Sequence, residues 1–277
     1  MSNTENQVHT TYKMSQSPYV LEIKTVQAST FKQIVDALKE ILIDVNFEFD
    51  ETGMKVVALD NTHVVLVHLK LAANKFETYY CENRRHIGLN MLKLHMLIKT
   101  ISNNDVLTLF VERDDHNRLG IRIENPDKNM CTTYKLDMLD LDITKINIPP
   151  ADFQTTINMP SSDFQKIVRD MNHLGDFIEI RSVENQLAFY CKGDFCTQET
   201  VFATDKNPNL NIERNSRTES HEIIQGVYSL KYLAMFTKCT NLSNVVSLFL
   251  QNNFPLVVEY QVGSLGTIKI CLAQQDN

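Results

Sequence analysis

PSSDFQKIVRDMNHLG, residues 160–175, is the stretch of sequence on which the fold depends. After Pro160, Ser161 or Ser162 can cap a helix, and Gly175 can end it. At 100° per residue the apolar side chains fall on one side, namely Phe164, Ile167, Val168, Met171 and Leu174. The opposite side carries Lys166, Arg169 and His173. One side is therefore typical of a core, and the other, taken alone, indicates only a solvated basic face.

The same pattern occurs twice along the chain. FKQIVDAL, starting at Phe31, repeats the spacing of FQKIVRDM, starting at Phe164, at a shift of 133 residues. DVLTLFV from Asp105 resembles NVVSLFL from Asn244 at a shift of 139 residues, with Lys99 and Lys238 in register before them. These two echoes predict a tandem duplication of one α+β unit.

Length and charge limit the possibilities further. A chain of 277 residues with 43% hydrophobic content can form two domains of about 130 residues each. The net charge of −7 argues against a protein that coats nucleic acid in a generic way. It leaves room for a local basic surface, because the lysines fall on presumed helices and the aspartates in presumed loops.

The cysteines and termini indicate the compartment. Six cysteines without a CxxC pair indicate reduced, mostly buried thiols of an intracellular protein. There is no apolar run of membrane-spanning length and no signal-peptide pattern. Residues 1–18 are polar and without periodicity, which predicts a disordered tail.

The first half, residues 19–134, is predicted to contain two helices and antiparallel strands. The helices are expected at residues 30–41 and 88–102. Strands are expected at 19–26, 46–49, 53–59, 63–72, 78–81, 106–111 and 119–124, with a turn at 50–53 and a polar segment at 112–118.

Residues 135–153, KLDMLDLDITKINIPPADF, interrupt this pattern. Pro149 and Pro150 exclude a helix, and the alternating aspartates and apolar residues are typical of an exposed extended strap. We interpret the segment as a connector between two domains, the second being residues 154–277. This half repeats the order of the first, with helices expected at 161–174 and 229–239, strands at 153–159, 177–182, 186–191, 196–203, 221–227, 245–251, 256–262 and 267–273, and a polar loop at 204–220.

Short matches at nearly constant spacing carry a resemblance to a known family. They are LDNTHVVLV from Leu59, FETYYC from Phe76, LDLD from Leu139, NIP from Asn147, MP at Met159, RD at Arg169, HLGD from His173 and PLVVEY from Pro255. Over residues 19–275 the chain resembles the proliferating cell nuclear antigen, the eukaryotic-type DNA sliding clamp. The resemblance implies an α+β fold of two similar clamp domains, and a homotrimeric ring with helices lining its channel and sheets outside.

The resemblance also implies that cationic residues face encircled double-stranded DNA without reading its sequence. The expected DNA-binding residues are Lys32, Lys39, Lys99, Lys166, Arg169, Lys231 and Lys238. The basic faces lack aromatic residues, which favours duplex over single-stranded DNA. Gln33 and Met96 stand where the family commonly has basic residues, so the grip on DNA is expected to differ.

Ring closure, by the same resemblance, pairs residues 130–136 of one copy with residues 196–203 of the next. The expected interface residues are Met130, Thr132, Tyr134, Leu136, Cys196, Gln198, Thr200 and Phe202. The alternative is that each of these edges is short and solvated.

A groove beneath the connector is implied to hold the short apolar and aromatic motif of a DNA polymerase, a clamp loader and other partners. The matching positions are Leu59, His63, Val64, Leu66, Ile146, Ile148, Phe153, Pro255, Cys271 and Ala273. An apolar set of this kind otherwise indicates ordinary core. Phe153 and Cys271 stand where the family commonly has Tyr, which predicts a shift in partner preference. Glu184 aligns with the family's modifiable lysine.

Chemistry-bearing motifs are missing from the sequence. It contains no P-loop, GxGxxG, GxSxG or HExxH pattern, and its eight histidines are scattered. His63 and His68 are expected on opposite faces of one strand, which is unsuitable for a shared metal. Asp140 and Asp142 could suggest a metal site, but acidic residues that keep the connector soluble explain them better. The sequence therefore predicts a non-enzymatic protein without cofactor or metal.

Three functional interpretations remain. A homotrimeric sliding clamp would serve DNA replication and repair as a processivity factor, in the nucleus or at a viral replication site. A subunit of a heterotrimeric checkpoint-type clamp would share the fold without self-association. A DNA-processing enzyme would need clustered carboxylates, which we do not find. Because both halves keep basic helices and the groove, the sequence favours the first.

Overall fold

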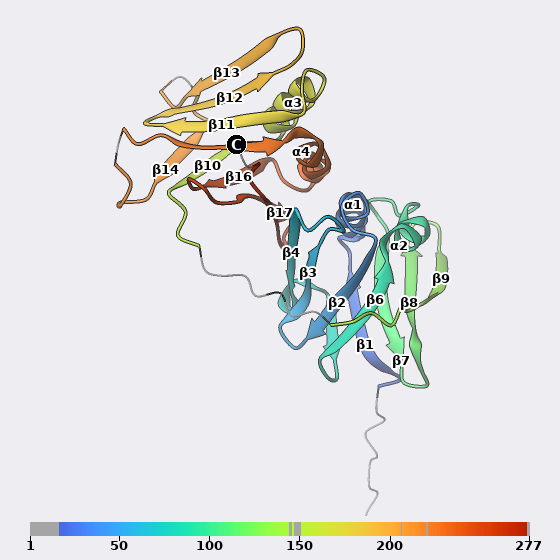
Figure 1. Cartoon of the computed structure of the whole chain (residues 1–277). Helices are drawn as coiled ribbons and strands as arrows, with labels where there is room; N and C mark the ends of the chain where they lie inside the picture. Colours follow the sequence, from blue (N-terminus) through green and yellow to red (C-terminus); the bar gives the residue numbers. More distant parts are fainter. Residues whose placement is uncertain (1–16, 144–145, 147–150, 206, 220, 276–277) are drawn as a thin grey trace, which may run out of the picture.

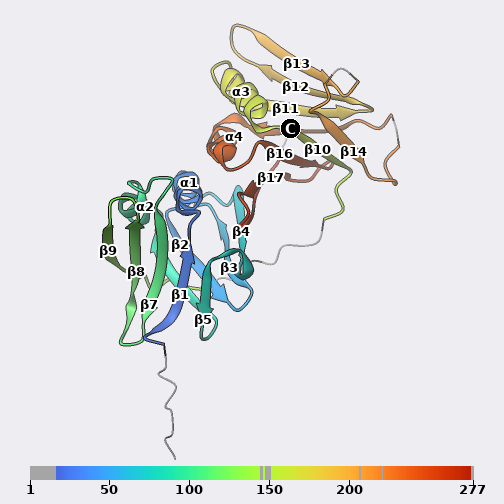
Figure 2. The same ribbon diagram turned by 180° about the vertical axis from the view of Figure 1, so that it is seen from behind.

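The computed structural model describes residues 17–143, 146, 151–205, 207–219 and 221–275. Of the tail 1–18, for which we predicted disorder, residues 1–16 lie outside these residues, as does Ile148 of the expected groove. Pro18 is described, and its carbonyl accepts a hydrogen bond from the Arg113 N–H at 2.9 Å. The described residues form an α+β fold in which antiparallel sheets are joined to four α-helices. Figures 1 and 2 show the helices of both halves on the same, concave side of the chain.

The first half, as far as it is described, has nine strands and two α-helices. Its elements are β1 (Tyr19–Thr25), α1 (Ala28–Leu38), β2 (Asp44–Asp50), β3 (Gly53–Leu59), β4 (Val65–Ala72), the 3-10 turn η1 (Ala73–Lys75), β5 (Thr78–Cys81), β6 (Arg85–Asn90), α2 (Met91–Ile98), β7 (Val106–Glu112), β8 (Asp115–Asn125) and β9 (Met130–Asp137).

The second half repeats this order. Its elements are β10 (Thr155–Pro160), α3 (Ser161–Asn172), β11 (Phe177–Val183), β12 (Gln186–Lys192), β13 (Thr197–Ala203), β14 (Asn211–Arg214), β15 (Ile224–Ser229), α4 (Leu230–Phe236), the 3-10 segment η2 (Thr237–Leu242), β16 (Val245–Leu250), β17 (Leu256–Val262) and β18 (Gly266–Leu272). The predicted duplication is confirmed as a repeat of strands and helices.

Several expected boundaries were wrong. The helix expected from residue 88 begins only at Met91, because residues 85–90 pair with β2 as strand β6. His63 precedes β4 and has a φ of 59°, so it lies in a turn and not on the strand. The polar loop 204–220 contains strand β14, which pairs with β10. The polar segment 112–118 is largely strand, because β8 begins at Asp115 and pairs with Glu112.

The ends of α3 also differ from the expected caps. No side chain caps its first turn, and the buried Ser161 hydroxyl instead donates to the Ser243 carbonyl next to β16. The last helical residue is Asn172, and the Gly175 N–H then bonds back to the Met171 carbonyl at 3.2 Å. The serine therefore ties the helix start to the neighbouring strand.

The sheets reveal how the two halves are joined. The first half contributes a five-stranded sheet, β5-β1-β7-β8-β9, and the second half a four-stranded sheet, β13-β12-β11-β15. A nine-stranded sheet, β14-β10-β16-β17-β18-β4-β3-β2-β6, crosses from one half to the other at the β18–β4 pair. Its inner face belongs to one cluster of buried side chains that includes Leu69, Ile268 and Ile270.

Candidate nucleic-acid interface and docking surface

The helices form a continuous row on the concave side. Helix α1 contacts α2 and η2, and α3 contacts α4 and η2. Each buries an apolar side, as α3 does with Phe164, Val168 and Met171. Because that side packs on the sheets, the opposite side of every helix faces solvent (Figure 1).

The seven cationic residues on these helices differ in exposure. Lys99, Lys166, Arg169, Lys231 and Lys238 are exposed, whereas Lys32 and Lys39 are half-buried. Arg169 has a loose contact of 3.4 Å with Asp170. Lys231 lies 5.9 Å from the centre of the Tyr232 ring. The four residues of this set that lie in the second half are therefore all exposed, and the contacts of Arg169 and Lys231 leave their charges at the surface.

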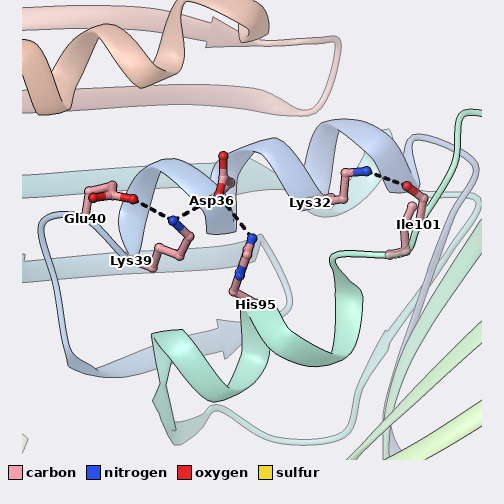
Figure 3. A network of polar contacts seen from close by, with 6 residues as sticks. All are labelled: Lys32, Asp36, Lys39, Glu40, His95 and Ile101. Atoms are coloured by element: carbon pink, nitrogen blue, oxygen red, sulfur yellow. Dashed lines mark hydrogen bonds and ion pairs between the residues drawn. The ribbon is translucent and has the colours of Figure 1, made fainter.

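The two half-buried lysines of α1 are bound within the protein, as Figure 3 shows. Lys39 Nζ lies 3.1 Å from Asp36 Oδ1 and 2.5 Å from Glu40 Oε1. The Glu40 carboxylate, together with Asp36, raises the pKa of Lys39. Lys32 Nζ donates to the Ile101 carbonyl at 2.5 Å. The charge of Lys39 is thus neutralised by carboxylates, and the ammonium group of Lys32 is hydrogen-bonded within the protein.

Helix α2 joins this network through a residue that sequence reasoning missed. His95 Nε2 lies 3.0 Å from Asp36 Oδ1, so Asp36 binds both Lys39 and His95 (Figure 3). The i,i+3 spacing of Asp36 and Lys39 predicts their pairing, but nothing in the sequence indicates that α2 brings His95 to the same carboxylate. The exposed side of α2 also carries Leu92, Lys93 and Met96.

A second surface lies on the face of the nine-stranded sheet that points away from the helices, which we call the outer face. Each of five neighbouring strands contributes one apolar residue to this face, and each residue lies directly opposite the next one. These side chains are partly exposed or nearly buried. This apolar row consists of Phe249, Val257, Cys271, Leu66 and Leu59. Phe153, after the connector, packs against Phe249 and Phe254 at ring distances of 5.5 and 5.7 Å.

Most of the expected groove residues lie along or beside this row. Leu66 and Cys271 pair with each other, the Ala273 N–H donates to the Val64 carbonyl at 3.0 Å, and Leu59 is 39% exposed. His63 is exposed, and Ile146, Phe153 and Pro255 are half-buried. Val257 and Phe249 were missed, although their alternation with buried neighbours in β17 and β16 was a usable signal.

Asp60 fixes the turn that precedes β4. Its carboxylate accepts hydrogen bonds from the backbone N–H groups of Val64 at 2.9 Å and Val65 at 2.7 Å, and from Thr62. Burial alone would raise the pKa of Asp60, but the hydrogen bonds from Thr62 and Val65 outweigh it, so the pKa lies below its ordinary value. Thr62 also contacts the Tyr232 hydroxyl of α4 at 2.9 Å. This turn therefore links the apolar row to the row of helices.

The strands expected to close a ring are β9 and β13. Each is the last strand of its sheet and has a neighbour on one side only among the described residues. Their inward-facing residues are half-buried, including Tyr134, Leu136 and Phe202, and Met130 is 50% exposed. Both strands therefore offer a free hydrogen-bonding edge.

Signs of catalytic or metal chemistry are few in the part of the chain described. No three His, Cys, Asp or Glu side chains there lie close enough to hold a metal ion. All six cysteines are free thiols; only Cys191 and Cys239 are fully buried, fewer than expected, and Cys131 is exposed. None of the helices among these residues has the length and apolar character needed to cross a membrane.

Comparison with known proteins gives matches from residue 20 to residue 275. Residues 20–146 match the family model for the proliferating cell nuclear antigen, N-terminal domain, and residues 147–275 match its C-terminal domain. The chain is 32% identical to a "Probable DNA polymerase sliding clamp 1" of Paramecium bursaria Chlorella virus 1, over 94% of this chain and 98% of that protein. It is 33% identical to the "Proliferating cell nuclear antigen" of Chaetomium thermophilum, over 92% of this chain and 97% of that protein.

Proposed function

The chain belongs to the proliferating cell nuclear antigen family of DNA polymerase sliding clamps, and from this we propose that three copies close into a ring around duplex DNA. In this role the protein gives a DNA polymerase its processivity by topological linkage and offers a docking surface to a clamp loader and other replication and repair proteins. The ring itself would catalyse no reaction. It would act in the nucleus or at a viral replication site.

The observation that carries the proposal is the β18–β4 junction inside the chain. By the 133-residue shift, Met54 of β3 corresponds to Leu187 of β12, and their partners Leu71 and Phe202 therefore correspond. By the 139-residue shift, Leu107 of β7 corresponds to Val246 of β16. Following the strand pairs from these two residues, Thr132 of β9 corresponds to Ile268 of β18. The free edges β9 and β13 are thus the repeats of two strands that already pair within the chain.

A head-to-tail contact between copies can repeat this junction. Gly266 lies opposite Leu71, and Ile268 opposite Leu69, in the β18–β4 pair. Their repeats place Met130 opposite Phe202, and Thr132 opposite Thr200, in a β9–β13 pair between two copies. A heterologous contact of this kind forms a ring when its rotation closes, and it covers both free edges.

The burial pattern supports the same register. Ile268, Ile270 and Leu272 of β18 are fully buried against β4. Their repeats in β9 are Thr132, Tyr134 and Leu136, which are half-buried in the single chain. The same holds for Val65, Val67 and Leu69 and their repeats Cys196, Gln198 and Thr200. A second copy would complete the burial of these edges, which include Met130 and Phe202.

We further propose that the row of helices lines the channel and contacts phosphates. The exposed cations Lys99, Lys166, Arg169, Lys231 and Lys238 lie on this row, and Lys32 and Lys39 can join them if their internal partners are displaced. Contacts of this kind hold DNA through its charge and carry no sequence information. They therefore suit a ring that moves along duplex DNA.

The apolar row is the proposed docking surface for partner motifs. Leu59, Leu66 and Cys271 are accessible on the outer face, beside Phe153 and the turn fixed by Asp60. Small apolar sites of this kind suit the aliphatic and aromatic anchors of a short peptide.

Sedimentation equilibrium of the purified chain tests the assembly. At micromolar concentration the homotrimer predicts three times the mass of the 31.9 kDa chain. A monomer that forms a ring only when mixed with other clamp subunits would instead support the checkpoint-type alternative. Primer extension on a singly primed circular template, with and without the protein, then measures processivity.

A further inference from the structure

The outer face carries a cluster of positive charge beside the apolar row. On β3 the outer residues are Lys55, Val57 and Leu59, because Met54 and Val56 are buried on the inner face. On β4 the outer residues are Leu66, His68 and Lys70. The three pairs across these strands are Leu59 with Leu66, Val57 with His68, and Lys55 with Lys70.

Lys55 and Lys70 therefore face each other across neighbouring strands, and we call them the basic pair. Like charges directly opposite each other in an antiparallel pair destabilise the sheet. Both side chains are exposed, and among the described residues neither has a carboxylate within 4.0 Å. Glu48, which is opposite Lys55 on its other side, is bound instead to Arg84 at 2.5 Å. The sheet thus keeps an arrangement that costs stability when nothing is bound.

Two more basic residues adjoin the pair. Lys269 of β18 lies opposite His68; its Nζ is 2.8 Å from Glu259 and 5.4 Å from the centre of the Phe249 ring. The half-buried His68 has a lowered pKa, chiefly because of burial and further because of Lys55, Lys269 and Lys70. Glu259 offsets the charge of Lys269, so Lys55 and Lys70 give this part of the outer face its positive charge, although the chain as a whole carries a net charge of −7.

The basic pair and the apolar row form one continuous surface. Lys70 follows Leu66 by four residues on the same face of β4. At about 3.3 Å per residue this separates the two positions by about 13 Å, which four residues of an extended peptide can span. A peptide with apolar anchors on the row can thus place acidic side chains near the basic pair.

We propose that Lys55 and Lys70 bind an acidic segment of a partner protein whose apolar anchors occupy the apolar row. The inference rests on the docking role proposed above and adds the charge of the preferred partner. A protein partner fits better than nucleic acid because the same surface is half apolar and the cationic row for duplex DNA lies on the opposite side of the sheet. The pair then exchanges a repulsive contact for attraction to carboxylates when the partner binds.

The test uses three synthetic peptides with the full-length protein. All share one aliphatic and two aromatic anchors, and they carry four Glu, four Ser or four Lys residues on either side of the anchor segment. Fluorescence anisotropy in 50 mM salt should show the Glu peptide binding about fivefold more tightly than the Ser peptide, and the Lys peptide more weakly. The gain should disappear in the Lys55→Gln/Lys70→Gln variant and at 0.5 M salt. The matched control, Lys75→Gln/Lys128→Gln, removes two exposed lysines elsewhere and should retain it.

Other outcomes separate the two proposals. If the Ser peptide binds and Leu59→Ser weakens it, but the Glu peptide gains nothing, docking stands and the acidic preference is overturned. If none of the peptides binds, or Leu59→Ser leaves binding unchanged, docking at the apolar row itself fails. If the Lys55→Gln/Lys70→Gln variant instead loses affinity for a 30-nucleotide single strand and not for the Glu peptide, the surface serves nucleic acid.

A stability measurement gives a readout that needs no ligand. Lys70→Glu creates an opposite-charge pair with Lys55 and has the neutral Thr267 opposite it on its other side. Its melting temperature should therefore exceed that of the wild type, while the Glu peptide should no longer bind more tightly than the Ser peptide. An unchanged or lower melting temperature would show that the basic pair carries no repulsion for a partner to relieve.

Discussion

Cys271 of β18 lies directly opposite Leu66 of β4, in the strand pair that joins the two halves of the chain. This pair does two things at once. It places two accessible side chains in the apolar row, and it shows the register in which one half of the duplicated unit meets the other. In the proposed ring the same register would occur again between neighbouring copies.

The register between copies is the first testable consequence. Thr267 lies opposite Lys70 inside the chain, and the corresponding residues of β9 and β13 are Cys131 and Val201. Val201→Cys should therefore place a thiol opposite the native Cys131 of the next copy. Mild oxidation should give covalent dimers and trimers on a non-reducing gel.

Two controls make this measurement specific. Adding Cys131→Ser should abolish the cross-link. Glu199→Cys, two residues away and diagonal to Cys131, should cross-link far less, because diagonal neighbours lie about 7–8 Å apart. Equal yields from both engineered cysteines would contradict the register.

The cations of the second half should contribute more to DNA binding than those of α1. Lys166, Lys231 and Lys238 are exposed, whereas Lys39 is held by two carboxylates. Replacing Lys166, Lys231 and Lys238 together by Gln should lower the affinity for a 30-base-pair duplex. The slope of the logarithm of the binding constant against the logarithm of the salt concentration should become shallower by about 0.9 for each phosphate that the variant no longer neutralises. Lys32→Gln/Lys39→Gln should have a smaller effect in the same anisotropy titration. A larger drop in affinity for the α1 variant would reverse the assignment.

Asp36 is expected to lower the affinity of the first half of the proposed channel for DNA. Its carboxylate binds Lys39 and His95, so Asp36→Asn removes a negative charge from the helix row and weakens the hold on Lys39. We expect severalfold tighter binding to the same duplex at low salt, with the trimer unchanged in sedimentation. Asp163→Asn, on α3 and without a cation within 4.0 Å among the described residues, serves as the control for a general change of charge. Equal gains from both variants would exclude a specific role for the Asp36 network.

Much of this architecture follows from periodicity, and the errors have physical causes. The apolar faces of α1 and α3 and the shift of 133 residues predicted the duplicated unit, because helix amphipathicity survives changes in individual residues. Strand β6 was mistaken for the start of a helix because HIGLN has no alternation that separates a strand from a helix start. Only its pairing with β2 identifies this segment as a strand.

The site was less predictable than the fold. The positions of Lys166 and Lys231 on exposed helix faces follow from helical spacing. The hydrogen bond from Lys32 to the Ile101 carbonyl does not follow from helical spacing, because it joins residues 69 apart in the chain. For the same reason the opposition of Lys55 and Lys70 needed the register of β3 and β4. Sequence spacing identifies faces, whereas contacts across the sheet require the structure.

The Asp60 turn should make stability depend on pH in a defined window. The folded-state pKa of Asp60 lies below its ordinary value, so its stabilising contribution is complete above the unfolded-state pKa and is lost as pH falls through the folded-state pKa.

Asp60→Asn replaces a carboxylate that accepts N–H bonds from Val64 and Val65, and the free energy of unfolding at pH 7 should fall by about 2 kcal/mol. Urea unfolding from pH 7 to pH 2 should show the difference between wild type and variant shrinking below about pH 4. Taking the difference removes the parallel contributions of Asp50 and Asp105, whose pKa values are also lowered. The exposed Asp114→Asn is the control and should match the wild type throughout; a difference for Asp60→Asn that stays constant down to pH 2 would show that the charge of Asp60 does not hold the turn.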